Sequence, residues 1–212
     1  MEIRIAELKE HLYLSLELIM EANGFKLKKS LSLFEKKVND IKYVLKFLFH
    51  VRSHEIAIEV FALIYYIPAE KLYKKASGIS METIGNEIGK LFRNPDGKMV
   101  DHRSEDICIS ERSELDFVVE KVLSMFNSVA LPYYQRFNTI DDIDSVLNDN
   151  PTEVSVHANA QYFRCPNALI VAKLAKRQDY NELEKIYNER MSTVSEVFKE
   201  RYDKVKDLLL NA

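Results

Sequence analysis

The sequence predicts an α+β domain: an N-terminal helix, a mostly antiparallel sheet of four or five strands, and a helical C-terminal half. Two changes in hydrophobic period carry this prediction. Apolar residues recur three or four apart over residues 2–22, alternate with other residues over about 31–65, and return to the helical spacing after residue 113. A helical stripe and an alternating strand each bury one face, so these segments can enclose a shared core.

The first helix is predicted over residues 2–22. Its apolar stripe consists of Ile5, Leu8, Leu12, Leu16 and Ile19. Asn23-Gly24 follows directly, and glycine readily takes the left-handed conformation in which many helices end. We therefore expect the helix to stop there.

Two long strands are predicted over 41–49 and 55–66, because their residues alternate strictly. One face of this pair is fully apolar, and it carries Ile41, Tyr43, Leu45, Phe47 and Phe49 together with Ile56, Ile58, Val60, Ala62 and Ile64. A weaker strand, "LSLFEKKV", precedes them, and Asn39-Asp40 forms a plausible tight turn between.

The stretch "HVRSHE" at 50–55 allows two interpretations, a metal site on a helix or the corner of a hairpin. If Arg52-Ser53 is the hairpin tip, Phe49 lies opposite Ile56 and Lys46 lies opposite Glu59, which are favourable pairs. A four-residue loop with the same register fits equally well. In this register His50 belongs to the outer face and His54 to the inner face, so the two histidines cannot share a metal ion.

The rest of the chain is predicted to be mainly helical. Further strands are expected in 77–85 and 105–111, and a helix from Ser113 that Pro132 interrupts. A short helix at "TIDDIDSVL", a helix opened by Pro166 and one long helix over 180–209 follow. We expect an α+β domain over 1–150 and a helical extension over 151–212 that packs on it.

The long terminal helix leads to an expectation about assembly. Its length exceeds that of a compact domain of this size, so part of its apolar stripe would lack a partner. The stripe is then covered either by the sheet or by a second copy of the chain. A homodimer through this helix is the second alternative.

Composition indicates an ordinary globular protein of 212 residues, with 47% hydrophobic and 30% charged residues. No apolar run is long enough for a membrane span, the N-terminus lacks the pattern of a signal peptide, and the two cysteines suit a reducing cytoplasm. Charge is uneven: residues 24–75 hold eleven Lys/Arg and five Asp/Glu, whereas 101–160 hold four and twelve. Such asymmetry can select partners.

No motif predicts a catalytic residue, a cofactor or a metal site. "GNEIGKL" has the wrong spacing for a phosphate-binding loop, and "DDIDSVLND" lacks the ligands and glycine of a calcium loop. An enzyme would need polar residues that converge only in the fold. An accessible Cys165 in one cleft with His102 and acidic residues would favour that alternative.

The outer face of the predicted sheet is more apolar than a face in water usually is. The residues that we predict to bind a partner are Lys37, Lys42, Lys46, Phe61, Leu63 and Tyr65. The C-terminal helices are the first candidate to cover this face, and a protein partner is the second. Aromatic and basic residues on a sheet are also typical of RNA-binding domains, but the ribonucleoprotein motif is absent and the net charge is −3.

Three stretches carry a resemblance to a family of uncharacterised bacterial domains: "NGFKLKKSLSLFEKK" after the first helix, the long hairpin, and "VALPYYQRF" at 129–137. The chain resembles this family over about residues 5–145. The resemblance implies a helix, a Gly-Phe-Lys segment, an antiparallel sheet and a helix ending in Ala-Leu-Pro-aromatic. It brings no known catalytic residues.

These observations lead us to expect a non-enzymatic protein-binding or accessory module of bacteria, located in the cytoplasm. An unrecognised enzyme and a nucleic-acid-binding sheet are the alternatives. We expect no cofactor, no nucleic acid and no membrane among its partners.

Overall fold

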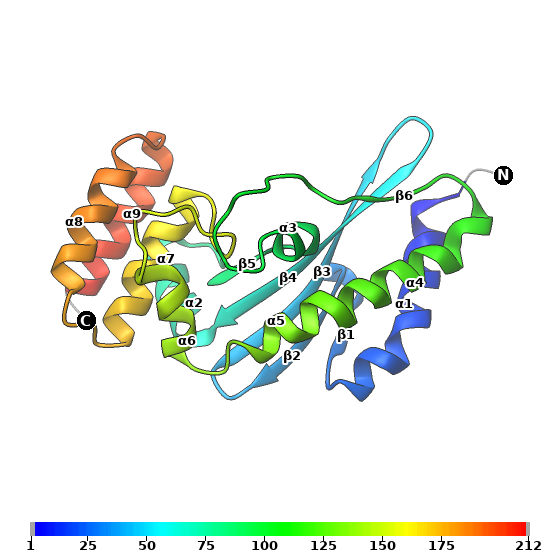
Figure 1. The fold of residues 1–212 in the computed structure, drawn as a ribbon, viewed down its shortest axis with the longest axis horizontal. Coiled ribbons are helices and arrows are strands. Elements are labelled where there is room, and N and C mark those ends of the chain that lie inside the picture. The colour runs from blue at the N-terminus through cyan, green and yellow to red at the C-terminus, as the bar shows by residue number, and fades with distance from the viewer. Residues whose placement is uncertain (1–2, 211–212) are drawn as a thin grey trace.

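A computed structural model describes residues 3–210, and it has the predicted α+β architecture (Figure 1). The strands are β1 (Lys26–Lys28), β2 (Leu33–Val38), β3 (Ile41–Val51), β4 (Ile56–Tyr66), β5 (Ile84–Glu87) and β6 (Ile107–Ile109). The path β1-β2-β3-β4-β5 makes a five-stranded antiparallel sheet, and β6 adds a sixth strand. β5 and β6 pair with different parts of the same edge of β4.

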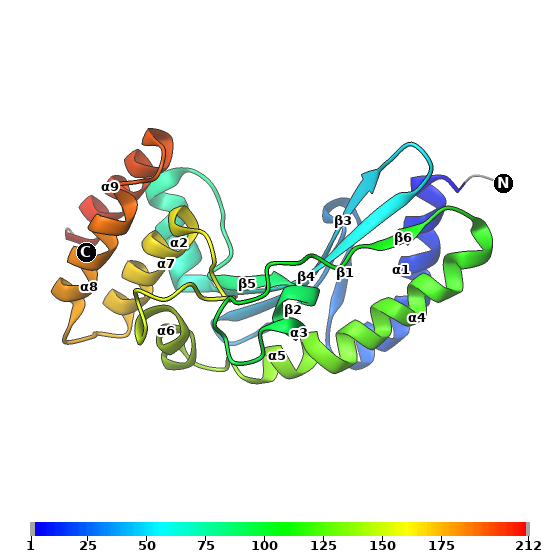
Figure 2. The same ribbon diagram turned by 45° about the horizontal axis from the view of Figure 1, so that its top comes forward.

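One face of the sheet, the inner face, forms the hydrophobic core with the helices beneath it in Figure 2. These helices are α1 (Ile5–Ala22), α3 (Ile88–Arg93), α4 (Leu115–Met125) and α5 (Leu131–Gln135). Tyr134 Oη donates a hydrogen bond to Val44 O at 2.7 Å, and Tyr43 Oη donates to Phe137 O at 2.9 Å. Two buried hydroxyl groups therefore fasten the end of α5 to the sheet.

The end of α1 follows the prediction. Gly24 has a φ of +81°, and the N–H of Phe25 donates to Met20 O at 2.9 Å. Glycine takes this left-handed conformation at little cost, so the chain can reverse into β1.

The remaining helices gather beyond one end of the sheet (Figure 1). They are α2 (Ile67–Ser77), α6 (Ile140–Asn148), α7 (Gln161–Leu174), α8 (Tyr180–Met191) and α9 (Glu196–Leu210). α7 lies at their centre, where it contacts α2, α6, α8 and α9. This group therefore combines helices from both sides of residue 150.

The prediction of one long helix over 180–209 was wrong. The chain turns at residues 192–195 and returns as α9, so α8 and α9 form a helical hairpin (Figure 2). Ser192 Oγ donates to Glu189 O at 2.6 Å and Thr193 Oγ1 donates to Arg190 O at 3.3 Å, so both hydroxyl groups bond the last turn of α8. Tyr187, Val205 and Leu209 are buried within the chain. The homodimer, which was the second alternative, was inferred from an uncovered stripe on one long helix, and that long helix is absent.

Two prolines do not have the predicted effect. Pro132 does not interrupt its helix, because a π-helical turn at Phe126–Ala130 leads directly into α5. Proline has no N–H and cannot donate the hydrogen bond of a regular α-helix. A π-helical turn just before it changes the pattern of these hydrogen bonds, so the helix can continue. Pro166 lies inside α7 instead of opening it, and every residue from Arg164 to Ala172 is buried. Proline prefers the first turn of a helix. Here the burial of α7 on all sides stabilises the helix by more than the cost of an internal proline.

The hairpin at "HVRSHE" is present, but its predicted register was wrong by two residues. Val51 pairs with Ile56, so a four-residue loop closes the hairpin and Phe49 lies opposite Ile58. Arg52 holds this loop, since its guanidinium contacts Glu55 at 2.8 Å and Asp106 at 2.6 Å. A shift of two residues keeps every strand side chain on its predicted face.

The two histidines of this stretch diverge, although not as predicted. His50 lies on the outer face, with Nε2 3.3 Å from Glu59 Oε1. His54 lies in the exposed loop and not on the inner face. Within residues 3–210 no three or more His, Cys, Asp or Glu side chains are grouped as metal ligands would be.

Candidate functional site

The six residues predicted to bind a partner lie together on one face of the sheet. β3 and β4 place Lys42 opposite Tyr65 and Lys46 opposite Phe61, and β2 places Lys37 opposite Lys42. Leu63 lies between Phe61 and Tyr65 on the same side of β4, opposite Val44. We call this side of β2, β3 and β4 the outer face.

Among residues 3–210 no helix packs along the middle of the outer face, although α2 reaches its end, where Glu70 contacts Lys42. Figure 2 shows the C-terminal helices rising at one end of the sheet and the β3–β4 hairpin rising at the other, with the sheet open between them. The expectation that the C-terminal helices pack on this face was wrong, because they pack on one another and on α2. Leu63 is still buried, at 4% exposure, although it lies outside the main core. Its neighbours Phe61 and Tyr65 are half-buried.

The lysines of the outer face differ in their partners. Lys42 Nζ lies 3.1 Å from Glu70 Oε2 and 4.0 Å from the centre of the Tyr65 ring. Burial raises the pKa of Tyr65 well above its ordinary value, with a contribution from the negative charge of Glu82. Lys37 and Lys46 form no ion pair with any residue between 3 and 210. The outer face therefore presents two lysines without an ion pair beside half-buried apolar groups.

The two residues of the enzyme alternative are not arranged for nucleophilic catalysis. Cys165 is completely buried in α7, and burial raises the pKa of its thiol to about 12. A protonated thiol without access to solvent is a poor nucleophile. His102 lies exposed in the loop between α3 and β6.

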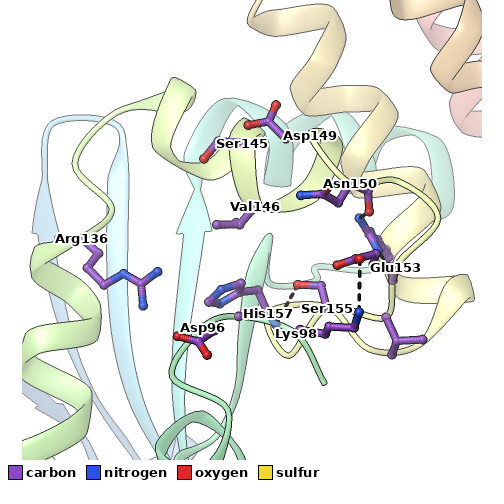
Figure 3. A pocket seen from close by; sticks show the side chains of 13 residues that line it. Asp96, Lys98, Arg136, Ser145, Val146, Asp149, Asn150, Glu153, Ser155 and His157 are labelled. Atoms are coloured by element: carbon purple, nitrogen blue, oxygen red, sulfur yellow. Dashed lines mark hydrogen bonds and ion pairs between the residues drawn. The ribbon is translucent and has the colours of Figure 1, made fainter. Parts of the chain in front are cut away.

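A second candidate site, which the sequence did not predict, lies beside the helices at the end of the sheet (Figure 3). It is a polar cavity of about 190 Å³, bounded by the turn at 96–98, the helix α6 and the loop at 149–157. An apolar cavity of about 370 Å³ lies next to it, lined by Leu91, Val129, Pro132 and Val156 among others. Arg136 and His157 line both cavities.

His157 is buried between these cavities, with 2% of its surface exposed. Its Nδ1 lies 3.1 Å from Tyr133 Oη, while Nε2 has no hydrogen-bond partner. If the Tyr133 hydroxyl donates to Nδ1, one group is left without a partner, which is Nε2–H. If Nδ1–H donates to the hydroxyl instead, two groups are left, the hydroxyl hydrogen and the lone pair of Nε2. We therefore assign the proton to Nε2. A buried donor without a partner costs about 1–3 kcal/mol.

The neighbourhood keeps this imidazole neutral. Burial lowers the pKa of His157 to about 3, and the positive charges of Arg136 and Arg164 add to the effect. Arg164 is itself 1% exposed and donates to the carbonyl oxygens of Leu147 and Asn150, at 2.5 and 2.9 Å. The loop that forms the polar cavity is thus wrapped around a buried guanidinium.

No family model, curated protein or solved structure matches this chain.

The geometry alone therefore has to indicate what the two sites do. Among residues 3–210, no helix combines the length and the hydrophobicity that crossing a bilayer requires. Strand alternation predicts the outer face, because it places each residue on one side of the sheet. It does not predict that Arg136 and His157 meet, because no local pattern links a helix end to a distant loop.

The buried His157 should make stability depend on pH. The unfolded chain takes up a proton on this imidazole near pH 6.5, whereas the folded chain does so only near 3. Between these values the unfolded state binds more protons, so stability is present above 6.5 and is lost as the pH falls. The loss is at most about 1.4 kcal/mol per pH unit.

Urea unfolding of the full chain at pH 7 and pH 5 measures this effect. His157→Gln keeps a hydrogen-bonding group near Tyr133 but cannot titrate, so its stability should fall less over the same interval. Equal pH dependence in the two proteins would contradict the assignment of a neutral, buried histidine.

Proposed function

We propose that this chain is a non-enzymatic binding module that takes an acidic, partly apolar protein segment on the outer face of its sheet. One observation carries the proposal: among residues 3–210 no helix packs over the half-buried Leu48 and Phe61 of the outer face, and Lys37 and Lys46 of the same face form no ion pair. A face that meets only water is usually more polar. Apolar area would supply affinity, and the two lysines would select acidic partners.

The chemistry of the face favours a protein over a nucleic acid. Glu35 and Glu59 project from the same side of β2 and β4 as the lysines, and the chain carries a net charge of −3. A polyanion along the face would meet these carboxylates. We include in the proposal that the module works in the cytoplasm of a bacterium, as the sequence resemblance and the two free cysteines imply.

Peptides selected against the full chain from a random phage-displayed library test this function. We expect the selected peptides to alternate Asp or Glu with aliphatic or aromatic residues. Synthetic versions should bind the variant Lys37→Glu/Lys46→Glu about tenfold more weakly, because two attractive charges become repulsive. The matched control is Lys185→Glu/Lys204→Glu, which makes the same charge change at exposed positions of α8 and α9.

Equal binding to both double variants, or selection of basic peptides, would overturn the proposal. Tighter binding of a labelled single-stranded oligonucleotide, with a steep dependence on salt, would assign the face to nucleic acid instead. Sedimentation of the full chain shows whether a second copy occupies the face.

A further inference from the structure

The two cavities that meet at Arg136 and His157 have complementary character. The polar cavity alone is smaller than the range of about 300–1,000 Å³ that is usual for ligand sites, whereas the apolar cavity, at about 370 Å³, falls within it. A molecule with a small polar end and a larger apolar body would match both. Such a molecule would have its polar end between Arg136 and His157.

Two of the three cations that line the polar cavity, Arg136 and Arg164, have no carboxylate partner among residues 3–210. Lys98 Nζ lies 3.2 Å from Glu153 Oε1, and the guanidinium of Arg164 is bonded to carbonyl oxygens. Arg136 has no acidic partner among residues 3–210, and its guanidinium carbon lies 5.6 Å from the centre of the Phe137 ring. Figure 3 shows the guanidinium of Arg136 directed toward the imidazole of His157. The exposed guanidinium of Arg136 and the buried imidazole of His157, whose Nε2–H has no partner, thus line the same junction.

We propose that this junction binds the carboxylate of a small amphipathic monocarboxylic acid, whose apolar body occupies the neighbouring cavity. The guanidinium of Arg136 donates to the carboxylate oxygens, for which its planar fork is suited. Nε2–H of His157, held in this tautomer by Tyr133, is the second donor. Leu91, Val129 and Val156 surround the body of the ligand.

A monoanion fits better than a phosphate. Asp96, Asp149 and Glu153 also line the polar cavity, so a dianion would meet like charges there. His157 is neutral and adds a donor without adding charge. The site is separate from the outer face and does not depend on the function proposed for that face.

Calorimetric titration of the full chain with octanoate tests the proposal. Octanamide is the matched ligand without charge, and butanoate is the matched ligand with a shorter body. We expect octanoate to bind at least about tenfold more tightly than octanamide. Each added methylene should improve affinity roughly threefold to fourfold, because it enters the apolar cavity.

Two arginine variants locate the anion. Arg136→Gln should weaken octanoate at least about tenfold while leaving octanamide unchanged. Arg103→Gln is the control, since Arg103 is exposed and pairs only with Asp101 outside both cavities. Nitrogen-15 spectra of the histidines give an independent signal, in which octanoate should shift Nε2 of His157.

The proposal is overturned if octanoate shows no saturable binding at millimolar concentrations, or if Arg136→Gln binds it like the native chain. If octanamide binds as tightly as octanoate, the site does not recognise a carboxylate and the proposal is wrong. Inorganic phosphate that competes as well as octanoate would replace the assigned chemical class. Binding without any change at His157 places the ligand elsewhere.

Discussion

Replacing Gly85 with alanine should destabilise the chain by roughly 3 kcal/mol or more. Gly85 lies in β5 with a φ of +139°, a conformation that a residue with a side chain rarely takes. An added Cβ would also lie 2.7 Å from Leu63 Cα and against the carbonyl oxygen of Ala62. Both neighbours are backbone atoms of the adjacent strand, so the clash can be relieved only by moving the sheet.

Gly78 provides a matched control for this substitution. Its φ is also positive, but at +80° it lies in the left-handed region at the end of α2, and an added Cβ would have no atom within 4 Å. Gly78→Ala should therefore cost only the conformational penalty, about 1–2 kcal/mol. Urea unfolding of both variants measures the extra cost at Gly85, to which its more extreme φ and the backbone clash both contribute. Equal losses of stability would refute the predicted clash.

Arg164→Met should lower the free energy of unfolding by about 3–5 kcal/mol. The guanidinium of Arg164 donates to three carbonyl groups of the segment 147–153, and Leu147 O lies in the last turn of α6, where the helix dipole favours a cation. Methionine fills similar space but donates no hydrogen bond. The variant leaves those buried acceptors without their donor.

Two further variants show whether the charge or its geometry matters. Arg164→Lys keeps the charge, but one ammonium group cannot reach all three carbonyls, so it should recover only part of the loss. Arg190→Met removes a half-buried arginine that bonds Gln161 and Pro151 O, and it should cost less than Arg164→Met. Equal stability of Arg164→Met and the native chain would show that the loop does not depend on this guanidinium.

The hairpin illustrates how far local pattern predicts this fold. Alternation assigns each residue of β3 and β4 to its face, because a strand has a period of two. The same alternation cannot distinguish registers that differ by two residues. In the observed register Arg52 lies in the loop, where its guanidinium contacts Asp106 of a distant part of the chain. No local pattern includes that contact.

The turn between the C-terminal helices and the two cavities could not be predicted from local pattern either, because both depend on contacts between distant parts of the chain. The apolar spacing of α8 runs on into α9, and only the hydroxyl groups of Ser192 and Thr193 mark the turn between them. Arg136 and His157 meet only because α5 and the loop at 149–157 are brought together by tertiary packing. Neither residue is part of a local motif that could have indicated a site.

The direct passage from β4 into α2 has a consequence for modularity. Tyr66 ends the strand and Ile67 begins the helix, so a strand with neighbours on both of its edges continues into the helical group. Ala69 and Tyr73 of α2 are buried, and α2 contacts α7 and α9. A genetic event that removed residues 151–212 would expose these side chains. The terminal helices are consequently not an independent module. A gene fusion that divides the chain at residue 150 would separate side chains that pack in one hydrophobic interior.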